Sequence, residues 1–228
     1  MESVSLRGAK VTYEELAYQH ILKAIVSHQF RPGDRLRPED LAALMGLSPT
    51  PVKQALARLA GEGLVELRSG LGPHVCAPTV SEILDLYDVR EMCEVYAIQK
   101  GFHRVDSAFL DRLEELFRRH ETAVASKGET QESRQEVVES DRDFHLHSVS
   151  LWPNPRVQML YRQLNVHIRA HQLADVPDYS RKEAVEEHRQ ILEAVRSADM
   201  VRAAEAMRRH VAAAKASFLA RAQLAGLA

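Results

Sequence analysis

The sequence predicts a mainly α-helical protein: an N-terminal winged helix-turn-helix over residues 1–76 and a C-terminal antiparallel all-helical bundle over residues 77–228. Three observations carry this prediction. Apolar residues recur at helical spacing along most of the chain, strand-like segments lie only on either side of Gly70, and short breaks rich in Pro, Gly, Ser and Asp separate the helical segments. A length of 228 residues suits two domains.

The composition is that of a soluble protein, with 45% hydrophobic and 27% charged residues and no apolar run of the roughly 18 residues that a membrane helix needs. No secretory signal is visible at the N-terminus. Cys76 and Cys93 form no CxxC pair, which argues against a disulfide scaffold and a cysteine zinc site. We therefore expect a cytoplasmic protein without a membrane partner. The net charge of −2 neither requires nor excludes nucleic acid.

Three helices are expected in the first domain. Residues 14–30 form an amphipathic helix that Pro32 and Gly33 interrupt, and residues 38–45 form a shorter one that ends at Gly46. The third helix is expected to follow closely, so that it and the second make a helix-turn-helix.

The third helix should begin at Pro51, with Thr50 as its cap, and run to Gly61 or Gly63. The segments LVEL and PHVC, joined by RSGLG, are typical of a two-stranded hairpin with a glycine-containing tip. A helix-turn-helix followed by such a hairpin is a winged helix.

The third helix also predicts DNA binding. Its hydrogen-bonding and basic side chains are Ser48, Thr50, Lys53, Gln54 and Arg58, and no acidic residue falls between the first and the last of them. Side chains of this kind meet base edges and phosphates when a recognition helix enters the major groove. The alternative is a helical packing module with incidental basic residues. The helix lengths, the turn, the wing and the local charge together favour DNA binding.

Residues 16–75 resemble the N-terminal domain of the GntR family of bacterial transcription regulators, through the PGDRL turn, the S-x-TPV-x-x-AL helix and the EGLVE strand. The resemblance implies that Ser48, Thr50 and Lys53 meet the operator, that Arg35 and Arg58 touch the DNA backbone, and that Gly70 enters the minor groove. Family members commonly have Arg where this chain has Pro49 and Lys53. Lysine cannot form the bidentate contact to guanine that arginine forms. The operator sequence can therefore differ from the one common in the family.

From Val80 onward no strand signal is visible, and the chain divides into about six helices. They are expected over residues 80–102, 106–126, 130–150, 154–173, 179–198 and 199–222. Helices joined by short breaks pack as an antiparallel bundle, in which ligands bind between facing side chains.

Four inward-facing apolar stripes of this bundle carry ionisable residues, namely Arg90, Asp141 with His145 one turn later, His188 and His210. Taken alone, an Asp–His pair at this spacing is common on exposed helices. Three histidines on different helices with one aspartate instead favour a shared divalent metal, because burying such groups unpaired costs about 1–3 kcal/mol each. The ligands suit zinc first, with nickel, manganese, cobalt or iron as alternatives. His147 is expected to be exposed, and His120 has no comparable context.

Residues 80–225 resemble, more loosely, the FCD ligand-binding domain of FadR-like GntR regulators, and six helices rather than seven suggest the VanR-like variant. The landmarks are LYDVREMCEVYA, DRDFH, the PNPR break, EHRQILEAV and MRRHV. Many such domains bind a divalent metal through one Asp and three His, which implies Asp141, His145, His188 and His210 here.

Arg90 is then the candidate clamp for an effector carboxylate. The alternative is a structural ion pair of Arg90 with Glu94 or Asp141. Asn165 and Arg169, on the fourth helix of the bundle, are further candidates for effector binding.

These features indicate a regulator and not an enzyme: a metal-containing homodimer that binds a pseudo-palindromic double-stranded DNA operator and a small carboxylate effector. Ligand-relieved repression is the expected polarity, and activation stays open. One alternative is a helical-bundle metalloenzyme with an ancillary DNA-binding module, for which Glu94 is the only general-base candidate. Another is a regulator whose signal is the metal itself.

Overall fold

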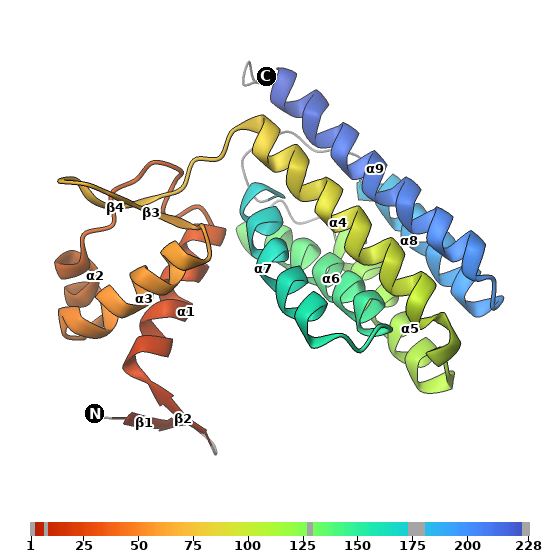
Figure 1. The fold of residues 1–228 in the computed structure, drawn as a ribbon, viewed down its shortest axis with the longest axis horizontal. Coiled ribbons are helices and arrows are strands. Elements are labelled where there is room, and N and C mark those ends of the chain that lie inside the picture. Colours follow the sequence, from red (N-terminus) through yellow and green to blue (C-terminus); the bar gives the residue numbers. More distant parts are fainter. Residues whose placement is uncertain (1–2, 7–8, 127–129, 173–180, 225–228) are drawn as a thin grey trace. The chain divides into compact units, whose positions relative to one another are not determined.

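The computed structural model describes residues 3–6, 9–126, 130–172 and 181–224, in two compact units, Met1–Pro78 and Thr79–Ala228 (Figure 1). Each unit has its own buried core. Among the described residues, no helix is both long and apolar enough to cross a membrane.

The first unit is a winged helix-turn-helix preceded by a short hairpin. Its elements are β1 (Ser3–Leu6), β2 (Ala9–Thr12), α1 (Tyr13–Val26), α2 (Pro38–Met45), α3 (Pro49–Gly61), β3 (Val65–Arg68) and β4 (Gly72–Val75). β3 and β4 pair antiparallel, with Val65 opposite Val75, and form the wing. A bridge between Arg35 and His74 joins the wing to the segment before α2.

The hairpin of β1 and β2 was not predicted. Its strands pair antiparallel with Val4 opposite Val11. The signal is present but short: polar and apolar residues alternate in SVSL, and the dipeptide RG separates the two strands in the sequence.

α3 begins two residues earlier than the sequence predicts. Ser48, with extended backbone, is the N-cap, and Pro49 rather than Pro51 is the first helical residue. Both prolines are compatible with this start, because the first turn of a helix has no acceptor for its backbone N–H groups. α1 ends at Val26 instead of residue 30, because His28 adopts a left-handed φ of 55°.

Apolar side chains of α1 and α3 form the core of the first unit. Ile21 is 0% exposed, Leu56 1% and Leu59 0%. The hydroxyl of Tyr18 on α1 donates to Glu62, just after α3, at 2.7 Å. One face of α3 is therefore fixed against α1, which leaves the opposite face to solvent.

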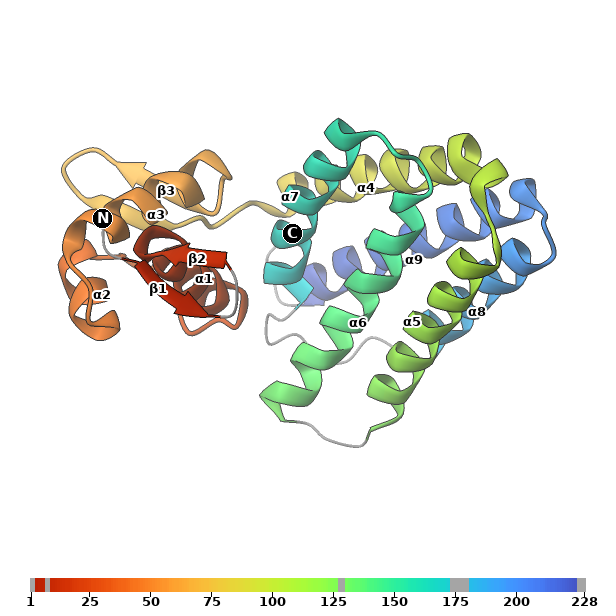
Figure 2. The same ribbon diagram turned by 90° about the horizontal axis from the view of Figure 1, so that it is seen from below.

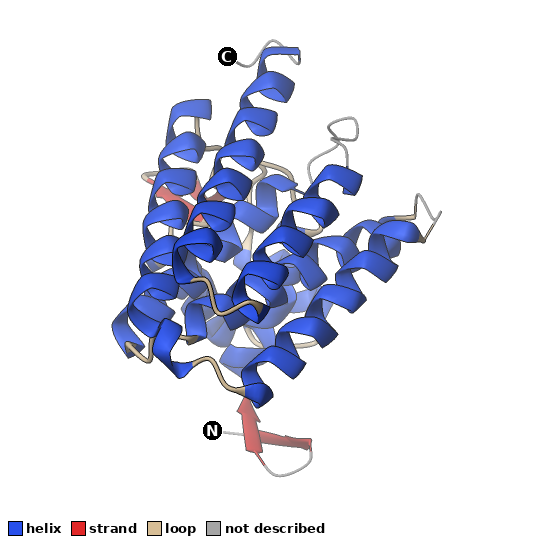
Figure 3. Ribbon diagram, turned by 90° about the vertical axis from the view of Figure 1, so that its right-hand side faces the viewer, coloured by secondary structure: helices blue, strands red, loops and turns tan. Residues whose placement is uncertain are grey.

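The second unit is a helical bundle. The α-helices that the structure describes in it are α4 (Val80–Gly101), α5 (Ser107–Ala125), α6 (Gln131–Ser150), α7 (Pro155–Gln172), α8 (Arg181–Arg196) and α9 (Met200–Leu224). α4 and α9 lie side by side, α8 turns back against α9, and α5 packs on α6 and α8 (Figure 2, Figure 3). The mainly helical fold class that the sequence predicts is confirmed.

The two ends of α4 are fixed by different means. At its start, Thr79 accepts from the N–H of Glu82 at 3.2 Å, and the Glu82 carboxylate accepts from the N–H of Thr79 at 2.7 Å, a reciprocal capping box. At its end, Gly101 is buried against Leu151, which follows α6. A Cβ added at Gly101 would collide with the Leu151 carbonyl group. Glycine at this position therefore permits the close approach of α4 to the end of α6.

Replacing Gly101 by Ala is expected to destabilise the protein by about 2 kcal/mol or more, because backbone atoms must move to admit the new methyl group. Urea unfolding followed by circular dichroism measures the change. Gly61→Ala is the control: the position is also the last residue of a helix but has open space around it, and its stability should be unchanged or higher by up to about 1 kcal/mol. A Gly101→Ala protein as stable as the wild type would contradict the close approach.

Candidate metal centre and nucleic-acid interface

Three imidazole nitrogens and a carboxylate converge inside the second unit. Asp141 and His145 come from α6, His188 from α8 and His210 from α9, and one potential ligand atom of each lies within 4.8 Å of all the others. His145 Nε2 lies 3.0 Å from His188 Nε2 and 3.1 Å from His210 Nε2. Asp141 Oδ1 lies 3.3 Å from His188 Nε2. The structure thus brings together all four residues that the sequence suggests as metal ligands.

The other ring nitrogen of each histidine, Nδ1, also has a hydrogen-bond partner. Each Nδ1 contacts a carboxylate or carbonyl oxygen: His145 the Glu94 carboxylate at 2.8 Å, His188 the Ala184 carbonyl at 2.7 Å, and His210 the Glu187 carboxylate at 2.8 Å. Metal-binding histidines are typically fixed in this way, because the bond sets both the tautomer and the ring orientation.

These bonds decide which atoms face the centre. A neutral imidazole with its proton on Nδ1 presents a lone pair at Nε2, so in this neutral form the three rings would face one another with lone pairs. One shared proton can bridge a single pair, whereas a cation satisfies all three rings and Asp141. Ligand atoms about 2.0–2.1 Å from one zinc ion and about 90–110° apart lie about 2.8–3.4 Å from each other. The two Nε2 separations of 3.0 and 3.1 Å and the 3.3 Å between Asp141 and His188 lie within this range, and the 3.7 Å between Asp141 Oδ1 and His145 Nε2 lies slightly above it. The group is therefore close to the spacing that one divalent transition metal needs.

The protonation of the four residues differs: His188 and His210 favour the neutral ring that binds a metal, whereas a metal ion would have to displace a proton from His145. Burial, helped by the neighbouring His188 and His145, lowers the pKa of His210 well below its usual value, and burial also lowers the pKa of His188. Burial opposes charge on Asp141 and His145 too, but their attraction for each other, with Glu94 beside His145, outweighs it. The pKa of Asp141 is therefore well below its usual value and that of His145 above it.

Glu94, on α4, links this centre to Arg90 on the same helix and to Tyr161 on α7. It is fully buried, pairs through Oε1 with Arg90 Nε at 2.6 Å, accepts from the hydroxyl of Tyr161, and holds His145 through Oε2. Burial opposes ionisation of Glu94, but the charges of Arg90 and His145 lower its pKa to about 2. Arg90 thus forms the ion pair that the sequence left open as an alternative, and its role in effector binding stays a prediction.

The residues that surround the four converging side chains were not predicted from the helical pattern of the sequence. His120 on α5, expected to lack such a context, is 2% exposed, and its ring centroid lies 4.8 Å from that of His188. Burial, with His188 nearby, lowers the pKa of His120 to about 4, so the ring is neutral at physiological pH. The signal for it was its place on the apolar stripe of Leu113 and Leu116.

The expectation that His147 is exposed was wrong. The side chain is partly buried, its ring stacks on that of Phe109 with centroids 4.2 Å apart, and its Nε2 lies 3.0 Å from the Phe109 carbonyl oxygen. α5 packs against this side of α6, which covers a position that an isolated helix would expose.

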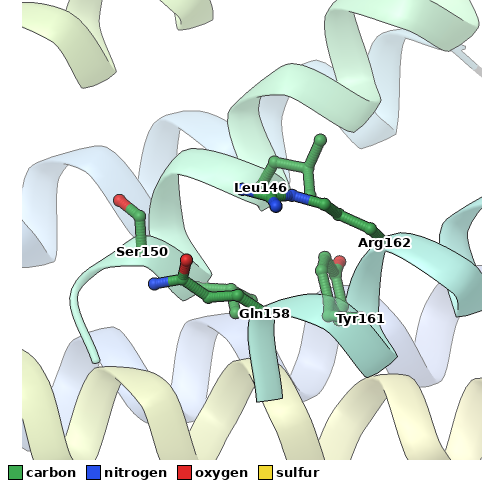
Figure 4. Close-up of a pocket in the computed structure, with 6 residues that line it drawn as sticks. Leu146, Ser150, Gln158, Tyr161 and Arg162 are labelled. Carbon is green, nitrogen blue, oxygen red and sulfur yellow. The ribbon is translucent and has the colours of Figure 1, made fainter. Parts of the chain in front are cut away.

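A small pocket opens between α6 and α7, on the side of Tyr161 (Figure 4). It is lined by Leu146, Val149, Ser150, Gln158, Tyr161 and Arg162 and has a volume of about 100 Å³. Small-molecule sites usually measure about 300–1,000 Å³, so this pocket is too small for an organic effector. The side chains of Asn165 and Arg169, further along α7, lie outside the described residues, and their roles stay predictions.

The predicted DNA contacts of the first unit are solvent-exposed. They are Arg35, Ser48, Thr50, Lys53, Arg58 and, at the wing tip with a φ of 73°, Gly70. Lys53 Nζ lies 3.2 Å from Glu39 Oε1, with both side chains about 60% exposed. An exposed pair of this kind contributes only about 0–1 kcal/mol, so Lys53 is readily available to a DNA phosphate or base.

Arg58 differs from the other predicted DNA contacts because residues of its own domain already contact its side chain. Its guanidinium lies 3.7 Å from the centroid of the Tyr18 ring and pairs with Glu15 at 2.7 Å and Glu62 at 3.4 Å. These contacts join α3 to α1. The contact of Arg58 with the DNA backbone stays a prediction.

Two family profiles match the chain. Residues 12–75 match the bacterial regulatory proteins of the gntR family, and residues 85–213, more than half of the chain, match the FCD domain. The chain belongs to the GntR family. Its second unit is an FCD domain, as in the FadR-like branch, so the resemblance seen in the sequence is confirmed.

GntR relatives match along much of their length. The Nta operon transcriptional regulator of Aminobacter aminovorans is 29% identical over 145 residues, 63% of this chain and 66% of that protein. The Uxu operon transcriptional regulator of Escherichia coli (strain K12) is 27% identical over 224 residues, 91% of this chain and 86% of that protein. The solved structure of E. coli McbR/YncC shares the fold, with a TM-score of 0.78 at 19% identity, and covers 92% of this chain and 98% of that one.

Membership of the GntR family fixes the class of the protein. It is a bacterial transcription regulator with an N-terminal DNA-binding domain, and the matched families and relatives are regulators rather than enzymes. The alternative of a helical-bundle metalloenzyme is therefore not supported.

Replacing His188 or His210 by Ala is expected to remove bound metal from the purified GntR protein, because each substitution deletes one of four ligands. Elemental analysis should give about one divalent ion per chain in the wild type and close to none in the variants. His147→Ala is the control, since this histidine lies on the same helix as His145 but contacts Phe109 instead. Unchanged metal content in both ligand variants would rule out the centre.

Proposed function

We propose that this GntR protein is a cytoplasmic, homodimeric repressor that binds a pseudo-palindromic operator and releases it when a small organic acid binds over a divalent metal. One observation carries the proposal: the ligand atoms of Asp141, His145, His188 and His210 converge. These residues would hold the ion, with zinc first and nickel, manganese, cobalt or iron as alternatives. A metal bound there supplies a Lewis-acidic point of attachment for a carboxylate.

The link to DNA binding is proposed to run through α4. This helix begins at Val80, next to the unit boundary at Pro78, and its Glu94 holds His145. An effector that changes the position of His145 would therefore act on α4, the first helix that follows the winged helix in the chain. In a dimer, such a shift changes whether the two recognition helices match the half-site spacing of the operator.

Arg90, Asn165 and Arg169 are proposed to complete the effector site. Arg90 acts from α4 through its ion pair with Glu94. Asn165 and Arg169 follow Tyr161 by four and eight residues in the sequence, a spacing that keeps residues on one side of a helix.

The names of the relatives support control of an operon. The Nta operon and Uxu operon regulators are each named for the operon they regulate. We propose that this chain likewise regulates one operon.

An exposed apolar face on α4 supports the homodimer. Val89, Met92 and Tyr96 are 44%, 69% and 44% exposed, and their spacing places them on one side of the helix. Asp85 lies before this face and Lys100 after it. Two copies of α4 packed antiparallel would set Val89 against Tyr96 and Asp85 against Lys100, so the face is complementary to itself in both packing and charge.

Met92→Asp is expected to shift the protein from dimer to monomer at micromolar concentration, because a charge at the centre of the face must be desolvated on association. Sedimentation velocity measures the species. Leu44→Asp is the matched control, as Leu44 is also 69% exposed but lies on α2. The double variant Asp85→Lys with Lys100→Asp should dimerise better than either single variant. A dimeric Met92→Asp protein would reject this face.

Operator binding tests the whole proposal, on DNA selected by the wild-type protein from random fragments. Fluorescence anisotropy is expected to show release of the wild type when zinc and a small carboxylate are added together. His210→Ala should bind the operator with wild-type affinity but no longer respond, because the metal is absent. Lys53→Ala should bind about tenfold or more weakly, through loss of a phosphate or base contact.

Three outcomes separate the alternatives. Release by zinc alone would make the metal the signal. Tighter binding on addition of the carboxylate would reverse the polarity to activation. Operator binding by Lys53→Ala that equals that of the wild type would mean that the recognition helix contacts DNA through other residues.

A further inference from the structure

His120 is a buried histidine with half of its hydrogen-bonding capacity unused. The side chain comes from α5 and is 2% exposed. Its Nδ1 lies 3.0 Å from Ser140 Oγ, whereas its Nε2 is buried and has no hydrogen-bond partner among the residues that the structure describes. A buried polar atom in a native protein nearly always has a partner, so each exception calls for a missing one.

The tautomer of His120 follows from its neighbour. The hydroxyl of Ser140 donates its single hydrogen to the Val137 carbonyl at 2.9 Å. The oxygen of Ser140 must therefore accept, and Nδ1 of His120 carries the ring proton. The unpartnered Nε2 is then a lone pair, and the partner it lacks is a hydrogen-bond donor rather than an acceptor or an anion.

The ring of His120 lies as close to the His188 ring as the rings of His145 and His210 lie to each other. Its centroid is 4.8 Å from that of His188, and the centroids of His145 and His210 are 4.9 Å apart. Nevertheless, its nitrogens do not belong to the group of converging ligand atoms. His120 thus lies next to one of the four converging residues, His188, without being one of them.

We propose that Nε2 of His120 accepts a hydrogen bond from a hydroxyl group of the effector, so that the centre selects hydroxy-substituted carboxylates over the corresponding unsubstituted acids. The inference rests on the metal-anchored effector site proposed above. The carboxylate would take the metal, and the hydroxyl would supply the donor that His120 lacks. A site that hydrogen-bonds a hydroxyl rejects the analogue without it, because the protein group is then buried without a partner.

Paired acids test this selectivity. Isothermal titration calorimetry of the zinc-loaded protein compares lactate with propionate and malate with succinate, each pair differing by one hydroxyl. In the wild type, at least one hydroxy acid should bind about tenfold or more tightly than its partner, as expected for one buried hydrogen bond. His120→Phe keeps a ring of similar size without an acceptor, and it should bind both members of that pair within about twofold of each other.

Two further variants separate loss of the acceptor from loss of structure. His120→Gln restores an acceptor oxygen and should recover part of the preference for the hydroxy acid. His147→Phe removes a partly buried histidine that bonds to Phe109, and it should keep the full preference. Elemental analysis of all variants should show wild-type metal content, since His120 is not a ligand.

The outcomes distinguish this inference from the proposed function. Equal preference for the hydroxy acid in the wild type and His120→Phe would overturn the role of His120 while leaving the metal-anchored site in place. Loss of metal from His120→Phe would overturn it as well, by making His120 a ligand. Failure of all four acids to bind the zinc-loaded wild type would overturn the inference, whereas wild-type protein that holds no zinc would reject the metal site itself.

Discussion

The convergence of three histidine Nε2 atoms, in rings each fixed by a bond at Nδ1, is the constraint on which the FCD domain depends. All six α-helices described in this unit contribute to it: α6, α8 and α9 supply the converging atoms, α4 supplies Glu94, α5 supplies His120, and α7 supplies Tyr161. Buried polar groups of this kind are costly unless every member is satisfied. The bundle therefore has a polar centre that specifies how its helices pack, provided that a cation balances the facing lone pairs.

Much of this arrangement could be read from the sequence, for a physical reason. Burial of one helical face imposes a spacing of three and four residues, so Asp141, His145, His188 and His210 stood out as polar residues on apolar stripes. Helix ends in the bundle likewise followed from local breaks such as PNPR, since Asn and Pro act within a few residues of their own position. The four converging residues and the helices that carry them could therefore be predicted from local sequence patterns.

The surroundings of the ligands could not be read in this way. Glu94 reaches His145 across 51 positions, and Glu187 reaches His210 across 23. Which acid meets which ring depends on the rotation and depth of packed helices, and periodicity fixes only the face that each helix buries.

The start of α3 was missed for a different reason: Pro49 and Pro51 are equally good first-turn residues, so local preference alone does not decide between Ser48 and Thr50 as the cap.

The state of Arg90 bears on where an effector carboxylate attaches. Arg90 is 2% exposed and its Nε already donates to Glu94, whose two oxygens also serve Tyr161 and His145. Drawing Arg90 away would leave a buried carboxylate without its main counter-charge, and breaking such a pair costs about 3–5 kcal/mol. A carboxylate bound at the proposed metal would meet no such cost, because nickel, manganese, cobalt and iron accept up to six ligands and zinc can expand from four to five. In the proposed site the metal would therefore be the stronger attachment point, and Arg90 would act on the effector through Glu94 and His145 rather than as a free clamp.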